Sequence, residues 1–373
     1  MKKMFCRQLL ACFCLVGVAF TSPAFAAYDG PKFSFRVAHT TPPGNHITLA
    51  FEKFKELVEK KSDGRISVQI FPNAMLGSDR VLMEGAQKGS LEMAVSSTPN
   101  MANFSPLYQI FDLPYITSPQ NQEKLYAAID SGELGKYLVK VAHDIALEPI
   151  MYAEYGYRNF VTIKKPISSV KDLAGLKIRT TDSPVEVEVA KALGMNPTPV
   201  AWGETYTALQ QGTVDGEGNT FPHLYGAKHH EVLKYAITSV HNYGMQVMMA
   251  NKKWWDKLDP KAQGLIREAA AEALTYQRTK LYPENEAKAR EGFIKAGIKI
   301  VDLTPEQVEE FRVATRPVWD KFMNQFPGWF WTPRSRRPWD ADRYDPHPFL
   351  CLTSQWSSHA EVEENGRLCR YAF

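Results

Sequence analysis

The sequence predicts an α/β fold with two lobes of similar plan, and three observations support it. Strand patterns alternate with helix patterns between residues 33 and 96, and the alternation returns after Pro149. A long helix pattern follows from residue 261 to about 296. Alternating strands and helices favour a mostly parallel sheet with its ligand loops at one edge. A chain of 373 residues is typical of about two domains.

The first 26 residues have the pattern of a secretory signal peptide. Lys2, Lys3 and Arg7 form a basic start, an apolar run covers 9–20, and 24–26 (Ala-Phe-Ala) form a cleavage site. The apolar run is shorter than the roughly 20 residues that a membrane-spanning helix needs. We therefore expect cleavage after residue 26 and a free protein in the bacterial periplasm.

The cysteine and charge content of the chain exclude some classes of function. No cysteine occurs between Ala27 and Pro327, and a chain of this length buries a large core without disulfides. The net charge is +3, and the signal peptide holds three basic residues and no acid, so the mature chain is close to neutral. This excludes a strongly basic nucleic-acid surface. Any anion selectivity has to come from individually placed residues.

Apolar alternation predicts the strands, and apolar residues at helical spacing predict the helices. In the first lobe, strands are expected at 33–38, 65–71 and 91–96, and helices at 47–61 and 80–88. In the second lobe, strands are expected at 150–154, 157–162, 176–179 and 213–218, and helices at 184–193 and 202–210. Loops at the carboxyl ends of these strands are expected to hold the ligand.

The C-terminal part of the chain is predicted to be helical. Asp259 caps a helix and Pro260 suits its first turn. At 1.5 Å per residue this helix spans roughly 50 Å, enough to lie across both lobes, and Pro283 is expected to kink it. A capping box that begins at Thr304 starts a second helix, which continues to about Phe326.

The composition changes after Pro327. Residues 328–373 contain no lysine and no isoleucine, yet they are rich in Trp, Arg, Pro and Ser. We interpret them as an atypical tail, frame-shifted or disordered, with a small accessory module as the alternative. No function is assigned to it.

Arg179 is the most informative single residue. It ends a short apolar strand, and residues 180–184 after it have the pattern of a helix start. This order places a permanent cation at the ligand edge of the sheet, beside unpaired helix N–H groups that favour an anion. A guanidinium group pairs with a carboxylate through two parallel hydrogen bonds. The alternative is a surface ion pair, with Asp182 or another acid.

Several patches in matching order together resemble one family. They are Phe71–Gly77 (FPNAMLG), Gly156–Asn159 (GYRN), Gly175–Arg179 (GLKIR) and the run Asn196–Asn219 with NPTPVAWGETYTALQ and VDGEGN. The chain resembles the DctP-type periplasmic solute-binding subunit of tripartite ATP-independent periplasmic (TRAP) transporters over about residues 28–326. The resemblance implies a two-lobed periplasmic binding protein (Venus-flytrap fold) with crossing hinge strands and a long helix spanning both lobes.

With this resemblance we expect 27–155 plus 245–284 to form lobe I, and 156–244 plus 285–327 to form lobe II. The hinge is expected near Tyr155 and Gly244, with bending of the long helix near Pro283. Closure of the lobes over the ligand excludes water and strengthens polar contacts.

The resemblance also assigns ligand-binding residues. It implies a main carboxylate clamp at Arg179, a second arginine at Arg158, an asparagine at Asn219 and a ligand-packing aromatic at Trp202. Variable contacts are expected from His39 and Ser97, in the loops after the first and third strands. A glutamate used by sialic-acid binders is Ser97 here, and an asparagine is His39, which argues against sialic acid. The alternatives from the residues alone are an ion pair with an acid on the lobe surface for Arg158, capping of the following helix for Asn219 and an ordinary place in the core for Trp202.

The sequence suggests two other kinds of site. His223, His229, His230 and Glu231 suggest a metal site, but adjacent rings on a helix diverge by about 100 degrees, so we expect solvated helix positions and no metal. Asp215 and Glu217 share one side of a strand, as an acid/base pair would. No nucleophile or zinc motif accompanies them, so we expect no catalysis.

The predicted function is periplasmic binding of a small organic acid by a monomer without a cofactor, and its delivery to the membrane subunits of a TRAP transporter. One alternative is a ligand-presenting partner of a periplasmic sensor, and another is a periplasmic hydrolase. Sugar acids, C4-dicarboxylates and other hydroxy or keto acids all present the same carboxylate to Arg179.

Overall fold

The computed structural model describes residues 28–326 and two short paired strands near the C-terminus, β11 (Glu363–Glu364) and β12 (Arg367–Leu368). The predicted signal peptide and most of the predicted tail lie outside the described residues. Among the helices of the described part, none combines the length and the apolar character needed to cross a bilayer.

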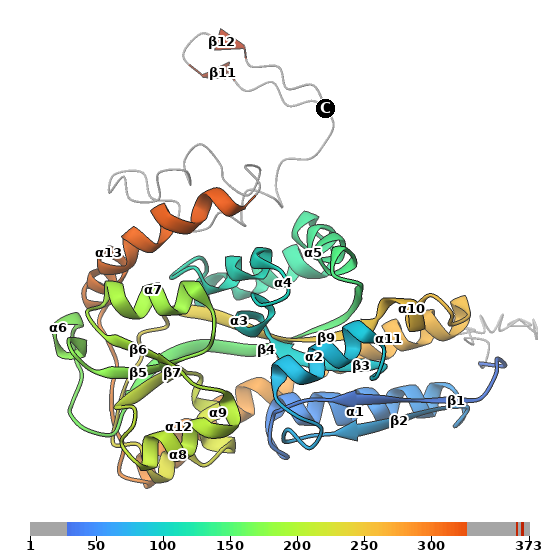
Figure 1. Cartoon of the computed structure of the whole chain (residues 1–373), viewed down its shortest axis with the longest axis horizontal. Helices are drawn as coiled ribbons and strands as arrows, with labels where there is room; N and C mark the ends of the chain where they lie inside the picture. Colours follow the sequence, from blue (N-terminus) through green and yellow to red (C-terminus); the bar gives the residue numbers. More distant parts are fainter. Residues whose placement is uncertain (1–27, 327–362, 365–366, 369–373) are drawn as a thin grey trace, which may run out of the picture.

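The main sheet has the strand order β2-β1-β3-β9-β4-β7-β5-β6; in addition, β8 pairs with β4, and β10 pairs with β8. The strands are β1 (Phe33–Ala38), β2 (Ile66–Phe71), β3 (Met93–Ser97), β4 (Leu147–Thr162), β5 (Lys177–Thr180), β6 (Asn196–Pro199), β7 (Gly216–Asn219), β8 (Tyr235–Ile237), β9 (Asn242–Asn251) and β10 (Lys299–Val301). Strands β1, β2 and β3 pair in parallel at one end, and β5, β6 and β7 pair in parallel at the other. Figure 1 shows these two groups as separate lobes, with β4 and β9 running between them.

Strands β4 and β9 connect the lobes as an antiparallel pair. Their register runs from Leu147 opposite Asn251 to Arg158 opposite Asn242, with an irregularity between Glu154 and Gly156. Beyond it, β4 pairs with β7 and β8 of the second lobe. All 16 residues of β4 are buried. The sequence patterns at 150–154 and 157–162 are therefore one strand rather than the two that were predicted, because the irregularity interrupts the alternation without ending the pairing.

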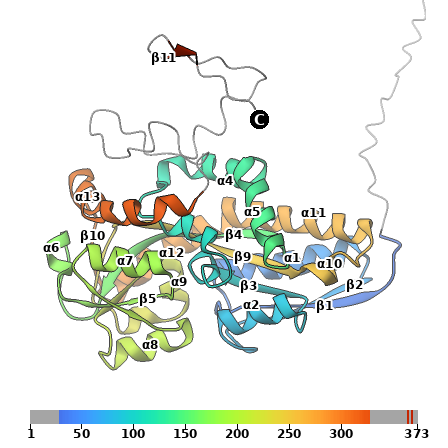
Figure 2. The same ribbon diagram turned by 45° about the horizontal axis from the view of Figure 1, so that its top comes forward.

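Helices cover both lobes. They are α1 (His46–Lys61), α2 (Asp79–Lys88), α3 (Thr98–Met101), α4 (Gln122–Asp130), α5 (Glu133–Asp144), α6 (Val170–Leu173), α7 (Pro184–Ala192), α8 (Trp202–Gln210), α9 (Phe221–Gly226), α10 (Lys252–Trp255), α11 (Pro260–Tyr276), α12 (Tyr282–Lys295) and α13 (Pro305–Phe322). Figure 2 shows α13 lying over α7, and α4 and α5 over the central strands. Apolar side chains of α1 and α11 pack with β1 to β3, and those of α8, α9 and α12 form a core in the second lobe.

The predicted long helix is present, but its interruption lies before the proline. Asp259 caps α11 by accepting from the Ala262 N–H at 3.0 Å. A π-helical turn, Gln277–Leu281, separates α11 from α12, and Pro283 lies in the first turn of α12. Helix α11 packs on α1 of the first lobe, and α12 packs on α9 of the second. The helix therefore lies across both lobes, as the sequence predicts.

The π-helical turn faces the irregularity in β4. Gln277 Nε2 donates to the Glu154 carbonyl at 3.1 Å, and Gln277 Oε1 accepts from the Glu154 N–H at 2.8 Å. A register shift in a strand leaves backbone groups unpaired, and a buried unpaired group is costly. One glutamine therefore satisfies both backbone groups of Glu154 and ties the long helix to the crossing strand.

Candidate functional site

Arg179 lies in β5, one residue before the strand ends, and its exposed fraction is only 4%. Its Nε donates to the Val200 carbonyl at 2.9 Å, which fixes the plane of the guanidinium group. Among the described residues, no carboxylate forms an ion pair with Arg179, and Asp182, the predicted alternative partner, is exposed. The two terminal nitrogens therefore remain available to an anion.

Arg158, on β4, is in contrast fully engaged by the protein. Its Nε and Nη2 donate to the Gly218 carbonyl at 3.1 and 2.5 Å, and its Nη1 lies 2.7 Å from Glu186 Oε1 on α7. Both side chains of this ion pair are buried. Burial alone would lower the pKa of Arg158, but the nearby negative charge of Glu186 raises it overall, so the guanidinium stays charged. Arg158 therefore pairs with an acidic residue, which was the alternative to a ligand contact.

A second carboxyl group lies close to that ion pair. Asp112 accepts from Ser183 Oγ at 2.6 Å, and burial together with the charge of Glu186 raises its pKa well above the ordinary value. One guanidinium therefore faces two carboxyl groups. The rise in pKa favours the protonated form of Asp112, which limits the buried negative charge to Glu186.

Asn219 ends β7 and is 1% exposed. Its Oδ1 accepts from the Tyr155 hydroxyl at 2.6 Å and from the Thr220 N–H at 2.9 Å. Its Nδ2 donates to Glu217 Oε2 at 3.2 Å. The N-cap of α9 is Thr220, so Asn219 does not have the capping position. Its side chain instead links the crossing strand β4, through Tyr155, to β7 of the second lobe.

Trp202 begins α8 and is partly buried. Its ring lies 5.8 Å from the Arg179 guanidinium carbon, and 4.1 and 4.8 Å from the rings of His223 and His229. The tryptophan is therefore next to the predicted clamp and outside the closed core, which is the arrangement expected of an aromatic wall.

The prediction that the histidines are solvated is wrong for two of them. His223 and His229 are each 2% exposed. His229 Nδ1 lies 2.5 Å from Glu217 Oε1, and His223 lies between Trp202 and Tyr155, with a ring distance of 4.8 Å to the latter. Burial lowers the pKa of His223 well below 6.5, and positive neighbours add to this effect, so its ring is neutral. The described residues contain no group of three or more side chains suited to holding a metal ion.

His39 and Ser97 lie on the first lobe, at the carboxyl ends of β1 and β3. The ring of His39 is fully buried, 5.1 Å from the ring of Phe51. Burial lowers its pKa to about 4, so it is neutral at ordinary pH. Ser97 is 7% exposed.

Sequence reasoning missed Asp79, the first residue of α2. It is 8% exposed, and its Oδ1 accepts from Thr40 Oγ1 at 3.2 Å and from Ser96 Oγ at 3.4 Å. Burial raises its pKa, whereas the Thr40 hydroxyl and the positive charge of Arg179 act in the opposite direction. The charge of Arg179 thus reaches a carboxylate of the other lobe. In the sequence, an aspartate in a first helical turn is an ordinary helix signal, so nothing distinguishes it.

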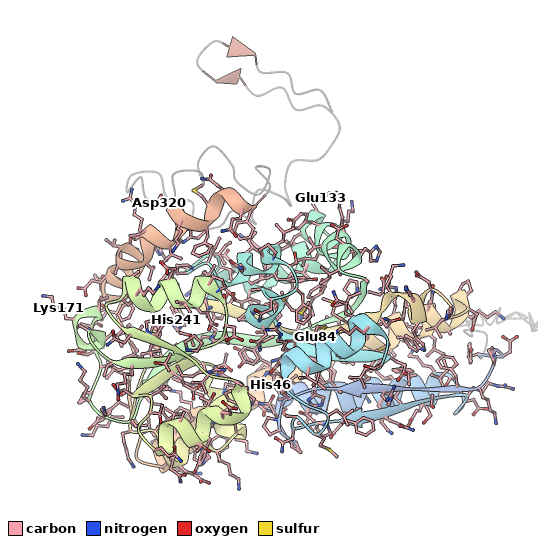
Figure 3. All side chains as sticks on the ribbon, viewed as in Figure 1. His46, Glu84, Glu133, Lys171, His241 and Asp320 are labelled. Atoms are coloured by element: carbon pink, nitrogen blue, oxygen red, sulfur yellow. The ribbon has the colours of Figure 1, made fainter. Side chains whose placement is uncertain are left out.

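The structure brings four predicted site residues together in the second lobe. Arg158 and Arg179 line one pocket with Thr180 and Asn242; Trp202 lies beside Arg179, and Asn219 is joined to the network through Tyr155. The buried Thr180 hydroxyl and the Asn242 side-chain oxygen have no hydrogen-bond partner among the described residues. Figure 3 shows His241, another wall of this pocket, within the second lobe, and His46 near the junction of the lobes.

Comparisons with known proteins agree with this architecture. The model of the family DctP, "Bacterial extracellular solute-binding protein, family 7", matches residues 37–325. The C4-dicarboxylate-binding periplasmic protein DctP of Rhodobacter capsulatus is 32% identical over 82% of this chain and 90% of its own. The 2,3-diketo-L-gulonate-binding periplasmic protein YiaO of Escherichia coli is 29% identical over 77% and 85%.

A solved structure also matches. The TRAP periplasmic solute-binding protein of Polaromonas sp. JS666, bound to D-erythronate, is 31% identical and covers 79% of this chain and 95% of its own, with a TM-score of 0.75. The resemblance found in the sequence and the predicted two-lobed α/β fold are both confirmed. The chain therefore belongs to the DctP family of bacterial extracellular solute-binding proteins.

Proposed function

We propose that this protein binds a small organic acid in the periplasm and delivers it to the membrane subunits of a TRAP transporter. The proposal depends mainly on the surroundings of Arg179. It is a buried guanidinium group whose Nε is fixed by Val200, while its terminal nitrogens have no carboxylate partner in the described chain. The named relatives bind diketogulonate, C4-dicarboxylates and erythronate, all of which bear a carboxylate.

The roles of the residues follow from their contacts. Arg179 makes a two-pronged, charge-assisted pair with the ligand carboxylate, and Trp202 covers the adjacent face of the ligand. Arg158 supports the site without contacting the ligand carboxylate, because its N–H groups hold Gly218 and Glu186. Asn219 orients the Tyr155 hydroxyl. Ser97 supplies a contact from the first lobe, whereas His39, which is fully buried, has no exposed surface for one.

Closure of the two lobes completes the site in this proposal. Lobe I comprises 27–155 with 245–284, and lobe II comprises 156–244 with 285–327. The hinge lies where Gly156 pairs with Gly244 and where the π-helical turn interrupts the long helix, since both places depart from regular pairing. A closed cleft excludes water, and the ion pair with Arg179 is stronger in that medium.

The contacts of Asp215 and Glu217 argue against a catalytic role for them. Asp215 lies 2.5 Å from the Lys164 ammonium group, and Glu217 lies 2.5 Å from His229. The two carboxylates considered as an acid/base pair are therefore held by different cationic or imidazole partners. This supports a binding protein that releases its ligand unchanged.

Calorimetric titration of the purified protein with organic acids tests the proposal. Arg179→Ala is expected to weaken binding by about 3–5 kcal/mol, more than a hundredfold, because the carboxylate would be buried without its partner. Arg290→Ala is the matched control, since Arg290 pairs with Asp302 on the surface and is expected to leave affinity unchanged. Binding by Arg179→Ala within a few-fold of the wild type would overturn the proposal.

A further inference from the structure

Two segments that follow strand ends, one from each lobe, are in direct contact. Residues 39–45 lead from β1 into α1 of the first lobe, and α9 follows β7 and Asn219 in the second. Apolar residues of α1 belong to the first-lobe core, whereas Phe221 and Leu224 of α9 belong to a separate core with α12. Loops at the carboxyl ends of strands are where such sheets hold ligands. A contact between these two segments therefore joins the two sides of the proposed cleft.

Asn45 makes this contact with its side-chain amide. Its Nδ2 donates to the Pro222 carbonyl, in the first turn of α9, at 3.2 Å and across 177 positions of the chain. Its Oδ1 accepts from the Ile47 N–H at 2.9 Å and so caps α1. Asn45 is 1% exposed. One side chain therefore has two separate tasks: its oxygen caps its own helix, and its nitrogen binds the opposite lobe.

The contact is closely packed, and a glycine leaves room for it. A Cβ added to Gly226, the last residue of α9, would lie 3.2 Å from Asn45 Nδ2 and 3.8 Å from Pro42 Cγ. The loop around Pro42 is held to α1, because Thr48 Oγ1 donates to the Pro42 carbonyl at 2.8 Å. Gly226 is helical, so its backbone does not require glycine. The close approach of the first-lobe loop is what a larger side chain would disturb.

Both partners are fixed to their own surroundings. His46 follows Asn45, and its Nε2 lies 3.1 Å from the Glu154 carbonyl of β4; Figure 3 shows His46 near the junction of the lobes. On the other side, the ring of Phe221 in α9 lies 5.0 Å from that of Phe293 in α12. A hydrogen bond weakens steeply when its distance or angle changes. The contact of Asn45 therefore depends on how the two lobes are oriented.

Helix α9 also packs against the predicted ligand wall. His223 follows Pro222 in the helix, and its ring lies 4.1 Å from the ring of Trp202. Trp202 in turn lies 5.8 Å from the guanidinium carbon of Arg179. The carbonyl to which Asn45 donates thus belongs to the helix that supports the proposed site from the second lobe.

We propose that Asn45 is a positioning residue that favours the closed arrangement of the lobes through its hydrogen bond to Pro222, and that it thereby slows the release of a bound organic acid. This inference rests on the proposed function, because it assumes that the acid is held between the two lobes. Asn45 acts without touching the ligand. A bond that is made only in the closed state increases the population of the state that retains the acid, and so increases the affinity.

The competing explanation is that Asn45 only caps α1. Asparagine, aspartate and serine are about equally good N-caps. The aspartate carboxylate has no N–H to donate, and the serine hydroxyl ends one bond short of the Nδ2 position. Asn45→Ser and Asn45→Asp therefore keep the cap and lose the bond to Pro222. Gly226→Ala disturbs the same contact from the other lobe, and it does not weaken α9, because alanine is a better helix former than glycine.

Calorimetry and stopped-flow tryptophan fluorescence test the proposal with D-erythronate, D-glucuronate and succinate, using the acid that the wild type binds most tightly. Asn45→Ser and Gly226→Ala are each expected to weaken binding about threefold to tenfold, the effect of one hydrogen bond. Asn45→Asp is expected to weaken it about tenfold or more, because its carboxylate would face a carbonyl oxygen in the closed state.

The rates and the stability separate the two explanations. The loss of affinity is expected in the dissociation rate, with the association rate within about twofold of the wild type, since the bond forms after the acid has entered. The urea midpoint of ligand-free Asn45→Ser is expected to equal that of the wild type, because the cap of α1 is retained. Asn45→Ala, which removes both the cap and the bond, is expected to lower the midpoint and the affinity together.

Thr304→Ala is the control for the loss of a cap alone. Thr304 caps α13 by accepting from the Gln307 N–H at 3.3 Å, and it is exposed. This variant is expected to lower the urea midpoint and to leave the affinity and both rates unchanged.

Two outcomes overturn the inference. One is an unchanged affinity in either Asn45→Ser or Gly226→Ala, and the other is a loss of affinity that arises from the association rate alone. In both cases the proposed function stands as long as an acid binds and Arg179→Ala abolishes that binding. Failure of every organic acid to bind the wild type would instead overturn the proposed function and the inference with it.

Discussion

Arg158 and Glu186 form a buried ion pair, with 2.7 Å between Nη1 and Oε1 and exposed fractions of 3% and 8% for the two side chains. The pair gives the two arginines of the site different tasks. Arg158 is neutralised within the protein, whereas Arg179 retains its charge for a ligand. The two arginines that line this pocket therefore provide one anion site rather than two.

The ion pair predicts that replacing Arg158 destabilises the protein more than replacing Arg179. Arg158→Met leaves Glu186 buried without its cation, and is expected to lower the free energy of unfolding by about 3–5 kcal/mol. Arg179→Met removes no ion pair, and in the ligand-free protein it is expected to cost no more than about 1.5 kcal/mol, the value of its bond to Val200. Urea unfolding of both variants measures the difference. Equal losses would show that Arg158 is no more integral to the fold than Arg179.

Gly156 is predicted to be essential to the crossing strand. Its φ of +106° lies where side chains are disfavoured, and a Cβ there would come within 2.7 Å of the Tyr282 hydroxyl. Gly156→Ala is therefore expected to destabilise the protein by about 1–3 kcal/mol. Gly264→Ala in α11 is the control, because a Cβ there meets nothing within 4 Å, and alanine favours a helix by about 1 kcal/mol. Thermal or urea unfolding should move in opposite directions for the two variants.

Gln277 is predicted to hold the long helix to the β4 irregularity. Gln277→Ala removes the side-chain acceptor of the Glu154 N–H and leaves the Glu154 carbonyl with His46 Nε2 as its remaining side-chain partner. The expected loss is about 1–3 kcal/mol for the N–H group left unpaired. Hydrogen exchange at the Glu154 amide is expected to accelerate in the variant. Gln120→Ala, at an exposed position, is expected to change neither quantity. An unaltered exchange rate at Glu154 would contradict this assignment.

Acid is predicted to destabilise the protein through buried histidines. Burial lowers the pKa of His39 from 6.5 to about 4 and that of His46 to about 3. Below pH 6.5 the unfolded chain binds protons at both rings, whereas the folded state keeps the rings neutral. The free energy of unfolding therefore decreases as the pH falls below 6.5, and these two histidines do not lower it above that pH. The loss at pH 4 is about 3 kcal/mol for His39.

Urea unfolding between pH 7 and pH 4 measures this effect. His39→Gln is expected to lose less stability on acidification than the wild type, by about the same 3 kcal/mol. Parallel pH profiles for the two proteins would refute the role of His39.

Local signals in the sequence were sufficient for most regular elements. The predicted strand at 33–38 is β1, and the predicted helix at 202–210 is α8. The capping box at Thr304 is present, with Thr304 Oγ1 accepting from the Gln307 N–H and Gln307 Oε1 accepting from the Thr304 N–H. Such patterns concern residues that are near each other in the chain, so they do not depend on the rest of the fold.

Strands that depend on distant partners were not predicted. Strand β9 is buried throughout, so it shows no alternation between an inner and an outer face. Strand β6 contains two prolines, which usually argue against a strand, yet it is found at the edge of the sheet, next to β5. Their pairing is a property of the folded chain.

The sequence by itself determined the family, the two α/β lobes and the position of a cation at the end of a strand, because ordered motifs and local periodicity carry that information. Only the tertiary structure decided that Arg158 is neutralised by Glu186, that His229 is buried against Glu217, and that the Tyr155 hydroxyl donates to Asn219. These contacts join residues between 12 and 64 positions apart in the chain. Burial and through-space charge act on whatever folding brings together, and separation along the sequence does not record it.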